Sequence, residues 1–218
     1  SSDVCSSDLL LEKLGLSAGY QRMGIITDDR RAIELYGKWK HLCNEFKYEE
    51  CSEVLAELEV LLPKNLVNEQ FIEWAKVSVA YWLKEIDTEG IINKLCYIIE
   101  KTIKFEELMT AESIFLSNNE ELILYTISTK YKFNKDKDKA LKFIQPIYNK
   151  LKSYGEADRQ KYIRNVELYM SYAASLLGSM GEYDESDKIS KDVMKAQLQY
   201  GRIHMIHRNI SSMAWNLY

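Results

Sequence analysis

Histidine and acidic side chains are the groups through which this sequence could bind a metal ion. His204 and His207 stand three residues apart, so they would share one face of a helix. A zinc ion needs three or four ligands, and no cysteine or carboxylate stands at helical spacing beside this pair. We therefore interpret both histidines as surface or packing residues and predict no metal site.

Catalytic constellations are also missing from the sequence. Glu49-Glu50 and Glu106-Glu107 are adjacent acids, whose side chains would point apart on a helix. The sequence places no serine or cysteine nucleophile with an orienting acid beside His41, and it contains no glycine-rich phosphate-binding loop. We expect a protein that is not an enzyme and that uses no cofactor.

The composition indicates a soluble globular protein. Hydrophobic residues make up 46% of the 218 residues and charged residues 28%, while nine glycines and two prolines are too few for a β-sandwich or a disordered tail. The net charge of -4 argues against a DNA-binding surface within this chain. No run of about 18 apolar residues could cross a membrane. Four cysteines without a C-x-x-C pair favour reduced thiols and a cytoplasmic location.

Apolar residues recur at helical spacing along most of the chain, with short polar turns between the runs. Asp28 and Asp29 are acids placed where a first helix would begin, and Pro63 would end the second. Asn65 can cap a third helix, and the segment from Tyr162 to Met180 predicts one long helix. We expect about nine helices in antiparallel pairs.

Two turns in the sequence are of the same kind. Residues 46–51 (FKYEEC) and 181–186 (GEYDES) both end with two acids and a small residue that follow an aromatic. Small residues recur at Cys51, Gly90, Ser128, Ala140, Ala174 and Ser186. This pattern resembles the tetratricopeptide (TPR) repeat, in which small residues let two helices pack closely. The resemblance implies an all-α fold, a right-handed superhelical stack of antiparallel helix pairs.

The sequence departs from regular TPR repeats in two respects. Trp39 occupies a position that is small in the family, and the anchors at 51, 90, 140 and 186 are spaced more widely than the family period of about 34 residues. We therefore expect a TPR-like α-solenoid rather than a regular TPR array.

Three segments are expected along the chain. Residues 1–9 contain a repeated Ser-Ser-Asp without apolar periodicity, and we interpret them as non-native. Residues 10–27 are predicted to be a linker, although Leu11 to Ser17 resembles the middle of a helix-turn-helix. Residues 28–218 form the predicted repeat domain. We expect it to be truncated at both ends, because Trp215 and Leu217 would leave the last helix uncovered.

The predicted stack resembles the C-terminal sensor half of Firmicutes helix-turn-helix regulators of the XRE type, the Rgg/PlcR-like family. The residues that support the resemblance are Asp28 to Pro63 and Tyr162 to Tyr218. It implies that the domain binds a short peptide or protein segment, forms a homodimer, and reaches DNA only through an upstream domain absent from this chain. A general protein-protein interaction scaffold and a Rap-type regulator of a signalling protein are the alternatives.

Inward-facing positions of the first helix in each pair are the expected peptide-binding positions in such a stack. The candidates are Tyr36, Tyr125, Thr129, Arg164, Ser171 and Asn209. Asparagine and arginine could hydrogen-bond the backbone of an extended peptide, and tyrosine could supply apolar contact at little entropic cost.

Overall fold

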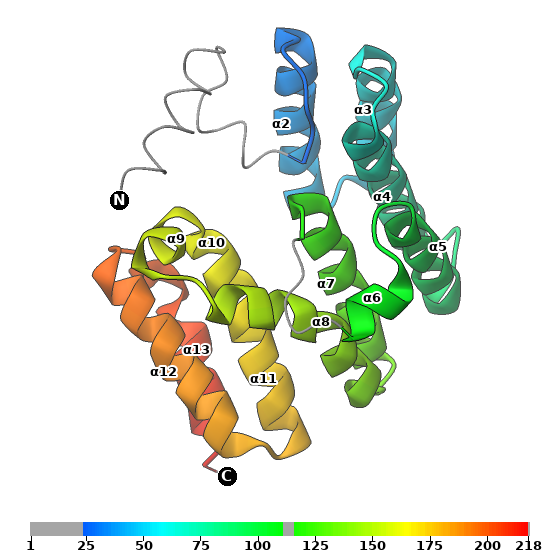
Figure 1. Cartoon of the computed structure of the whole chain (residues 1–218). Helices are drawn as coiled ribbons and strands as arrows, with labels where there is room; N and C mark the ends of the chain where they lie inside the picture. Colours follow the sequence, from blue (N-terminus) through cyan, green and yellow to red (C-terminus); the bar gives the residue numbers. More distant parts are fainter. Residues whose placement is uncertain (1–23, 111–115, 218) are drawn as a thin grey trace. The chain divides into compact units, whose positions relative to one another are not determined.

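The computed structural model describes residues 24–110 and 116–217, and every regular element in these ranges is a helix (Figure 1). The predicted all-helical class is therefore confirmed for this part of the chain. The predicted non-native segment 1–9 and residues 10–23 of the predicted linker lie outside the described residues. None of the described helices is long and apolar enough to span a membrane.

The chain divides into two units. Unit 1 comprises the described residues up to Ile99 together with Ser117–Asn119, and unit 2 comprises those from Glu100 to Leu116 and from Glu120 onward. The helices of unit 1 are α2 (Arg30–Asn44), α3 (Tyr48–Leu61), α4 (Leu66–Trp82) and α5 (Thr88–Glu100). The predicted cap of α4 is confirmed, because the side chain of Asn65 accepts a hydrogen bond from the amide of Asn68 at 3.0 Å.

Aromatic rings from α2 and α4 form the centre of unit 1. The ring of Trp39 lies edge-on to Phe71 and to Trp74, at centroid distances of 5.3 and 5.8 Å. The end of the predicted linker packs into this unit: Ile25 is buried, and the amide of Ile26 donates to Asn68 Oδ1 at 2.7 Å. Residues 24–27 thus pack against unit 1, and the side chain of Ile25 belongs to its core.

Unit 2 begins with short α6 (Phe105–Thr110) and continues with seven further helices. These are α7 (Asn118–Phe133), α8 (Lys137–Lys152), α9 (Glu156–Lys161), α10 (Ile163–Asn165), α11 (Ser171–Met180), α12 (Tyr183–Gln199) and α13 (Ile206–Trp215). A π-helical turn, Val166–Met170, precedes α11, and a 3-10 turn, Ile203–Met205, precedes α13.

The helix predicted from Tyr162 to Met180 is found as a continuous helical run from Ile163 to Met180, in which α10, the π-helical turn and α11 follow one another without a break. Within the π-helical turn Glu167 is buried and accepts hydrogen bonds from Arg202 and Gln197, at 2.8 and 3.3 Å. Burying a carboxylate without such partners would cost several kcal/mol. The π-helical turn and the ion pair of Glu167 therefore occur together in this structure.

Residues twelve positions apart meet where the two helices of a pair cross. The hydroxyl of Ser128 on α7 donates to the carbonyl of Ala140 on α8 at 2.6 Å. The hydroxyl of Ser186 on α12 donates to the carbonyl of Ala174 on α11 at 2.8 Å. In α2 and α3, the thiol of Cys51 lies 4.0 Å from the carbonyl of Trp39. The small residues singled out in the sequence at these crossings are therefore all buried between paired helices.

Gly90 is an exception, and its interpretation as the small anchor of the second pair is wrong. Cys51, Ala140 and Ser186 each stand three residues after the start of their helix, and the corresponding residue of α5 is buried Ile91. The amide of Gly90 instead donates to the side chain of Asp87 at 2.7 Å, which caps the first turn of α5.

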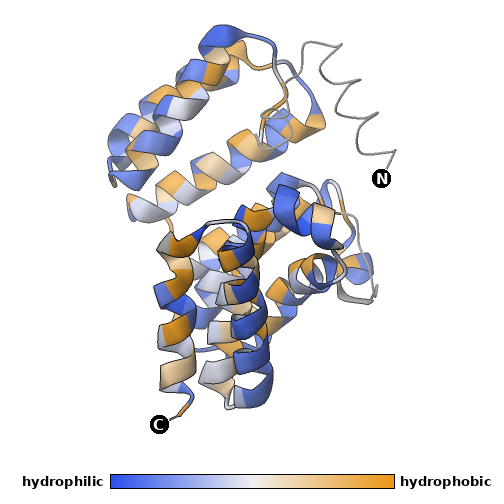
Figure 2. Cartoon of the chain, turned by 90° about the vertical axis from the view of Figure 1, so that its left-hand side faces the viewer, coloured by the Kyte–Doolittle hydropathy of each residue, from blue (hydrophilic) through white to orange (hydrophobic). Residues whose placement is uncertain are grey.

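The ends of five helices share one backbone geometry. A residue with positive φ ends the helix, and the amide after it donates to the carbonyl five residues earlier, as in the Schellman motif. The positive-φ residues are Phe46, Lys84, Lys135, Gly181 and Gly201, and the closing bonds are Lys47–Leu42, Glu85–Ala80, Asp136–Tyr131, Glu182–Leu177 and Arg202–Gln197. Hydrophobic and hydrophilic residues alternate along the helices that these turns connect (Figure 2), as expected for helices that bury one face.

Candidate ligand-binding face

Three helices of unit 2 expose no carboxylate. The acids of α7, Glu120 and Glu121, are both buried, while α11 and α13 contain no acidic residue. By contrast, α12 contains Asp184, Glu185, Asp187 and Asp192. None of the exposed acidic residues that give the chain its net charge of -4 therefore belongs to α7, α11 or α13 in the described ranges.

Tyrosines join α7 to the segment that follows α10. The ring of Tyr125 lies 5.2 Å from that of Tyr169 and 5.1 Å from that of Tyr172. The hydroxyl groups of Tyr172 and Ser128 are 3.1 Å apart and hydrogen-bonded. Burial raises the pKa of Tyr172 to about 12 and also raises that of Tyr125. Both phenols therefore remain neutral at physiological pH, where they offer aromatic surface and hydrogen-bonding groups.

Two cations border these tyrosines. The ammonium of Lys132 lies 3.2 Å from the hydroxyl of Ser175 and 5.1 Å from the centre of the Tyr172 ring. Burial lowers the pKa of Lys132, and the charges of Lys137 and Arg208 lower it further. Arg208 is exposed on α13, a helix that packs against α11, and its charge also lowers the pKa of Tyr125. Within the described ranges, neither Lys132 nor Arg208 forms an ion pair with a carboxylate.

These side chains constitute what we call the α7–α11–α13 face, defined by Tyr125, Thr129, Lys132, Tyr172, Ser175 and Arg208. It presents two cations and several hydroxyl groups beside aromatic rings. Chemically, such a set can bind an anionic or polar group and hold apolar atoms next to it.

Of the six residues predicted from the sequence, Tyr125 and Thr129 come together on this face, one helical turn apart on α7. Ser171 and Asn209 are buried inside unit 2, and Arg164 is exposed on short α10. Tyr36 belongs to unit 1, where its hydroxyl accepts a hydrogen bond from the amide of Gly24 at 3.3 Å.

The sequence reasoning did not find Lys132, Tyr172, Ser175 or Arg208. One signal was available in the sequence, since Tyr125, Thr129 and Lys132 follow the i, i+4, i+7 spacing of a single helix face. The positions of Tyr172 and Arg208 depend on how three helices pack, so no pattern along the chain could identify them.

Asn209 belongs to a chain of buried polar groups behind this face. Its side-chain amide donates to Gln197 Oε1 at 3.3 Å, and Gln197 Nε2 donates to Glu167 Oε1 at 3.3 Å. Glu167 is also paired with Arg202. Because Arg208 and Asn209 are consecutive residues of α13, this chain of hydrogen bonds fixes the part of α13 that holds Arg208.

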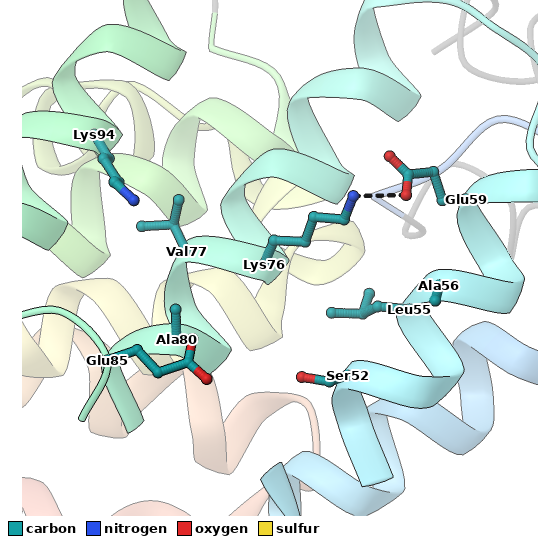
Figure 3. A pocket seen from close by; sticks show the side chains of 9 residues that line it. All are labelled: Ser52, Leu55, Ala56, Glu59, Lys76, Val77, Ala80, Glu85 and Lys94. Carbon is teal, nitrogen blue, oxygen red and sulfur yellow. Dashed lines mark hydrogen bonds and ion pairs between the residues drawn. The ribbon is translucent and has the colours of Figure 1, made fainter. Parts of the chain in front are cut away.

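Unit 1 contains a pocket of about 360 Å³ between α3, α4 and α5 (Figure 3). Lys76 extends from α4 to Glu59 on α3, with 2.6 Å between the ammonium and a carboxylate oxygen. An adjacent hollow of about 450 Å³ is lined by apolar atoms that include Val77, Tyr97 and Ile98. The Tyr97 side chain is 68% exposed, so this surface could also contact a partner.

The described residues contain no group of three or more histidine, cysteine or acidic side chains arranged to hold a metal ion. Comparisons of the chain with protein families, with curated proteins and with solved structures find no match.

Proposed function

We propose that this chain is a TPR-like repeat domain that binds a short peptide or protein segment on the α7–α11–α13 face. The observation on which the proposal rests is that these helices expose tyrosine, hydroxyl and cationic groups but no carboxylate. The crossing contacts twelve residues apart support the repeat interpretation, because they recur in three helix pairs. A right-handed superhelical stack of such pairs would present its first helices on the concave side.

The wider proposal is that the domain senses its ligand for a transcriptional regulator of the Rgg/PlcR-like type. In this proposal the protein is a cytoplasmic homodimer that reaches DNA through a separate upstream domain. Peptide binding would favour one of two curvatures of the stack, and it could do so only through different affinities for the two states. The sequence resemblance supports this proposal, as does the buried polar chain that ties α13 to α12 and the π-helical turn.

Peptide capture tests the binding function. The full chain would be immobilised and exposed to a pool of random heptapeptides, and the retained peptides would be counted by mass spectrometry. Retention should fall about tenfold in Tyr125→Ala, because aromatic side chains at the centre of an interface contribute most of its affinity. Tyr183→Ala, which removes a half-exposed tyrosine from α12, is the matched control and should retain peptides normally. Equal retention by all three proteins would overturn the proposed face.

A protein-protein interaction scaffold is the second candidate, and the hollow beside Tyr97 favours it. Apolar pockets with a few polar groups at the rim commonly accept a partner's side chain. If Tyr97→Glu abolishes binding of a partner protein whereas Tyr125→Ala does not, the unit 1 surface is the functional one. A Rap-type regulator would be distinguished by a signalling protein as that partner.

A further inference from the structure

The distribution of charge on the α7–α11–α13 face is opposite to that of the whole chain. The chain has a net charge of -4, yet this face presents Lys132 and Arg208 and no exposed acid from its own three helices. Neighbouring like charges destabilise a protein unless a counter-charge is present. Lys132 is bonded to Ser175 of α11, and α13, which carries Arg208, packs against the same helix. Because neither cation has an ion-pair partner in the described ranges, this face points to an anion supplied from outside.

We propose that the ligand presents a carboxylate, which Lys132 and Arg208 bind beside the rings of Tyr125 and Tyr172. This inference rests on the proposed peptide-binding function and specifies the chemistry of the peptide. The carboxylate can be an acidic side chain or the C-terminus of the peptide. In either case its two oxygens match the paired N–H groups of a guanidinium and the point charge of an ammonium.

The surroundings of Lys132 are suited to holding such a group. Its ammonium is half-buried and is anchored by Ser175 on one side and the Tyr172 ring on the other. An ammonium has three N–H donors, so the hydroxyl of Ser175 leaves donors available to a carboxylate. Lys137 is less available, because its ammonium already donates to the carbonyl of Ser179.

A nucleic acid is a poorer match than a peptide carboxylate. Nucleic-acid binding relies on many phosphate contacts and releases a counterion for each. This face offers two cations, and the acids of α12 belong to the same unit. The tyrosine rings could stack on bases, so a single-stranded oligonucleotide is included in the test as a competing outcome.

The test compares three heptapeptide pools on the immobilised full chain. The first has free C-termini and all residue types, the second is the same pool amidated, and the third is amidated and lacks acidic residues. The variant is Lys132→Gln/Arg208→Gln. The control is Lys191→Gln/Lys195→Gln, which removes two exposed lysines from α12 and thus changes the net charge equally. Arg208 is exposed, so Arg208→Gln alone serves as a second variant whose folding is not at risk.

We expect the wild type and the control to retain the first pool, and the double variant to retain about tenfold less, as is typical for a lost charged hydrogen bond. Retention of the second pool would identify an acidic side chain, and its loss would identify the C-terminus. Suppose instead that the third pool is retained, that the double variant retains it equally well, and that Tyr125→Ala does not retain it. This result would overturn the proposal that the ligand presents a carboxylate, and the proposal of peptide binding would stand. If the wild type retains no pool, both proposals fail. Tighter retention of a fluorescein-labelled oligonucleotide, lost in the double variant, would also overturn the carboxylate assignment.

Discussion

Substitutions at the helix-ending turns offer a sharp test of the repeated hairpin geometry. Lys135 adopts a φ of 63° between α7 and α8, and Gly181 adopts a φ of 91° at the equivalent position between α11 and α12. A side chain in this left-handed region costs about 1–2 kcal/mol because Cβ crowds the following carbonyl. Glycine avoids that cost but loses about 0.5–1 kcal/mol more conformational entropy on folding.

The difference between the steric cost of a side chain and the entropic cost of glycine predicts how substitutions at Lys135 and Gly181 change stability. Lys135→Gly should raise the free energy of unfolding by about 0.5–1 kcal/mol. Gly181→Ala should lower it by about 1 kcal/mol. A Cβ added at Gly181 would have no atom within 4 Å, so the backbone conformation alone should produce the loss. Lys135→Ala keeps a Cβ in the turn and should leave stability close to that of the wild type.

Urea denaturation followed by far-ultraviolet circular dichroism would measure these changes as shifts in midpoint at constant slope. The comparison that decides is Lys135→Gly against Lys135→Ala, since both remove the same long side chain. A lower midpoint for the glycine variant than for the alanine variant would refute the left-handed turn at Lys135. It would also refute the equivalence of this turn with the one at Gly181.

Three further predictions concern unit 2. Ala174→Leu should lower the free energy of unfolding by about 3 kcal/mol, because Ala174 is fully buried where α11 crosses α12 and the extra atoms have no space. Urea denaturation would measure this loss, and Ser175→Leu, at an exposed position of the same helix, is the control. Arg202→Met should lower the melting temperature, because it leaves the buried carboxylate of Glu167 without its cation at a cost of about 3 kcal/mol. An unchanged melting temperature would show that the ion pair between Arg202 and Glu167 does not stabilise the fold. Burial lowers the pKa of Lys130 to about 8, so the folded state is penalised for the charged form; this cost is absent above the unfolded pKa and grows as the pH falls to about 8. Lys130→Met should accordingly gain stability relative to the wild type between pH 9 and pH 7, measured by urea titrations at both values.

Several features of the fold could be predicted from the sequence because they depend on neighbours along the chain. Asn65 caps α4 through an amide three residues away, so its role follows from residue type and position. The turns at 46–51 and 181–186 could be matched because their closing hydrogen bonds span few residues. Gly90 was misassigned because α5 begins at Thr88, so that Ile91 is the residue that stands three positions after the helix start.

The candidate site was only partly accessible to such reasoning. Tyr125 and Thr129 could be found because they lie one turn apart on one helix. Asn209 and Ser171 were expected to face a ligand, but both are buried, and the side chain of Asn209 bonds to Gln197 of α12. Helical periodicity shows that residues share a face, and it cannot show whether another helix covers that face.

The sequence by itself determined the all-helical class, the caps and most of the turns, because these follow from hydrogen bonds and periodicities spanning only a few residues. The tertiary structure alone decided that Glu167 is buried with Arg202, that the segment before α11 adopts a π-helical turn, and that Lys132 lies against Tyr172. Each of these depends on contacts between residues about 35 to 40 positions apart. Such contacts form only when separate helices bury their apolar faces together, and that packing sets which polar groups meet.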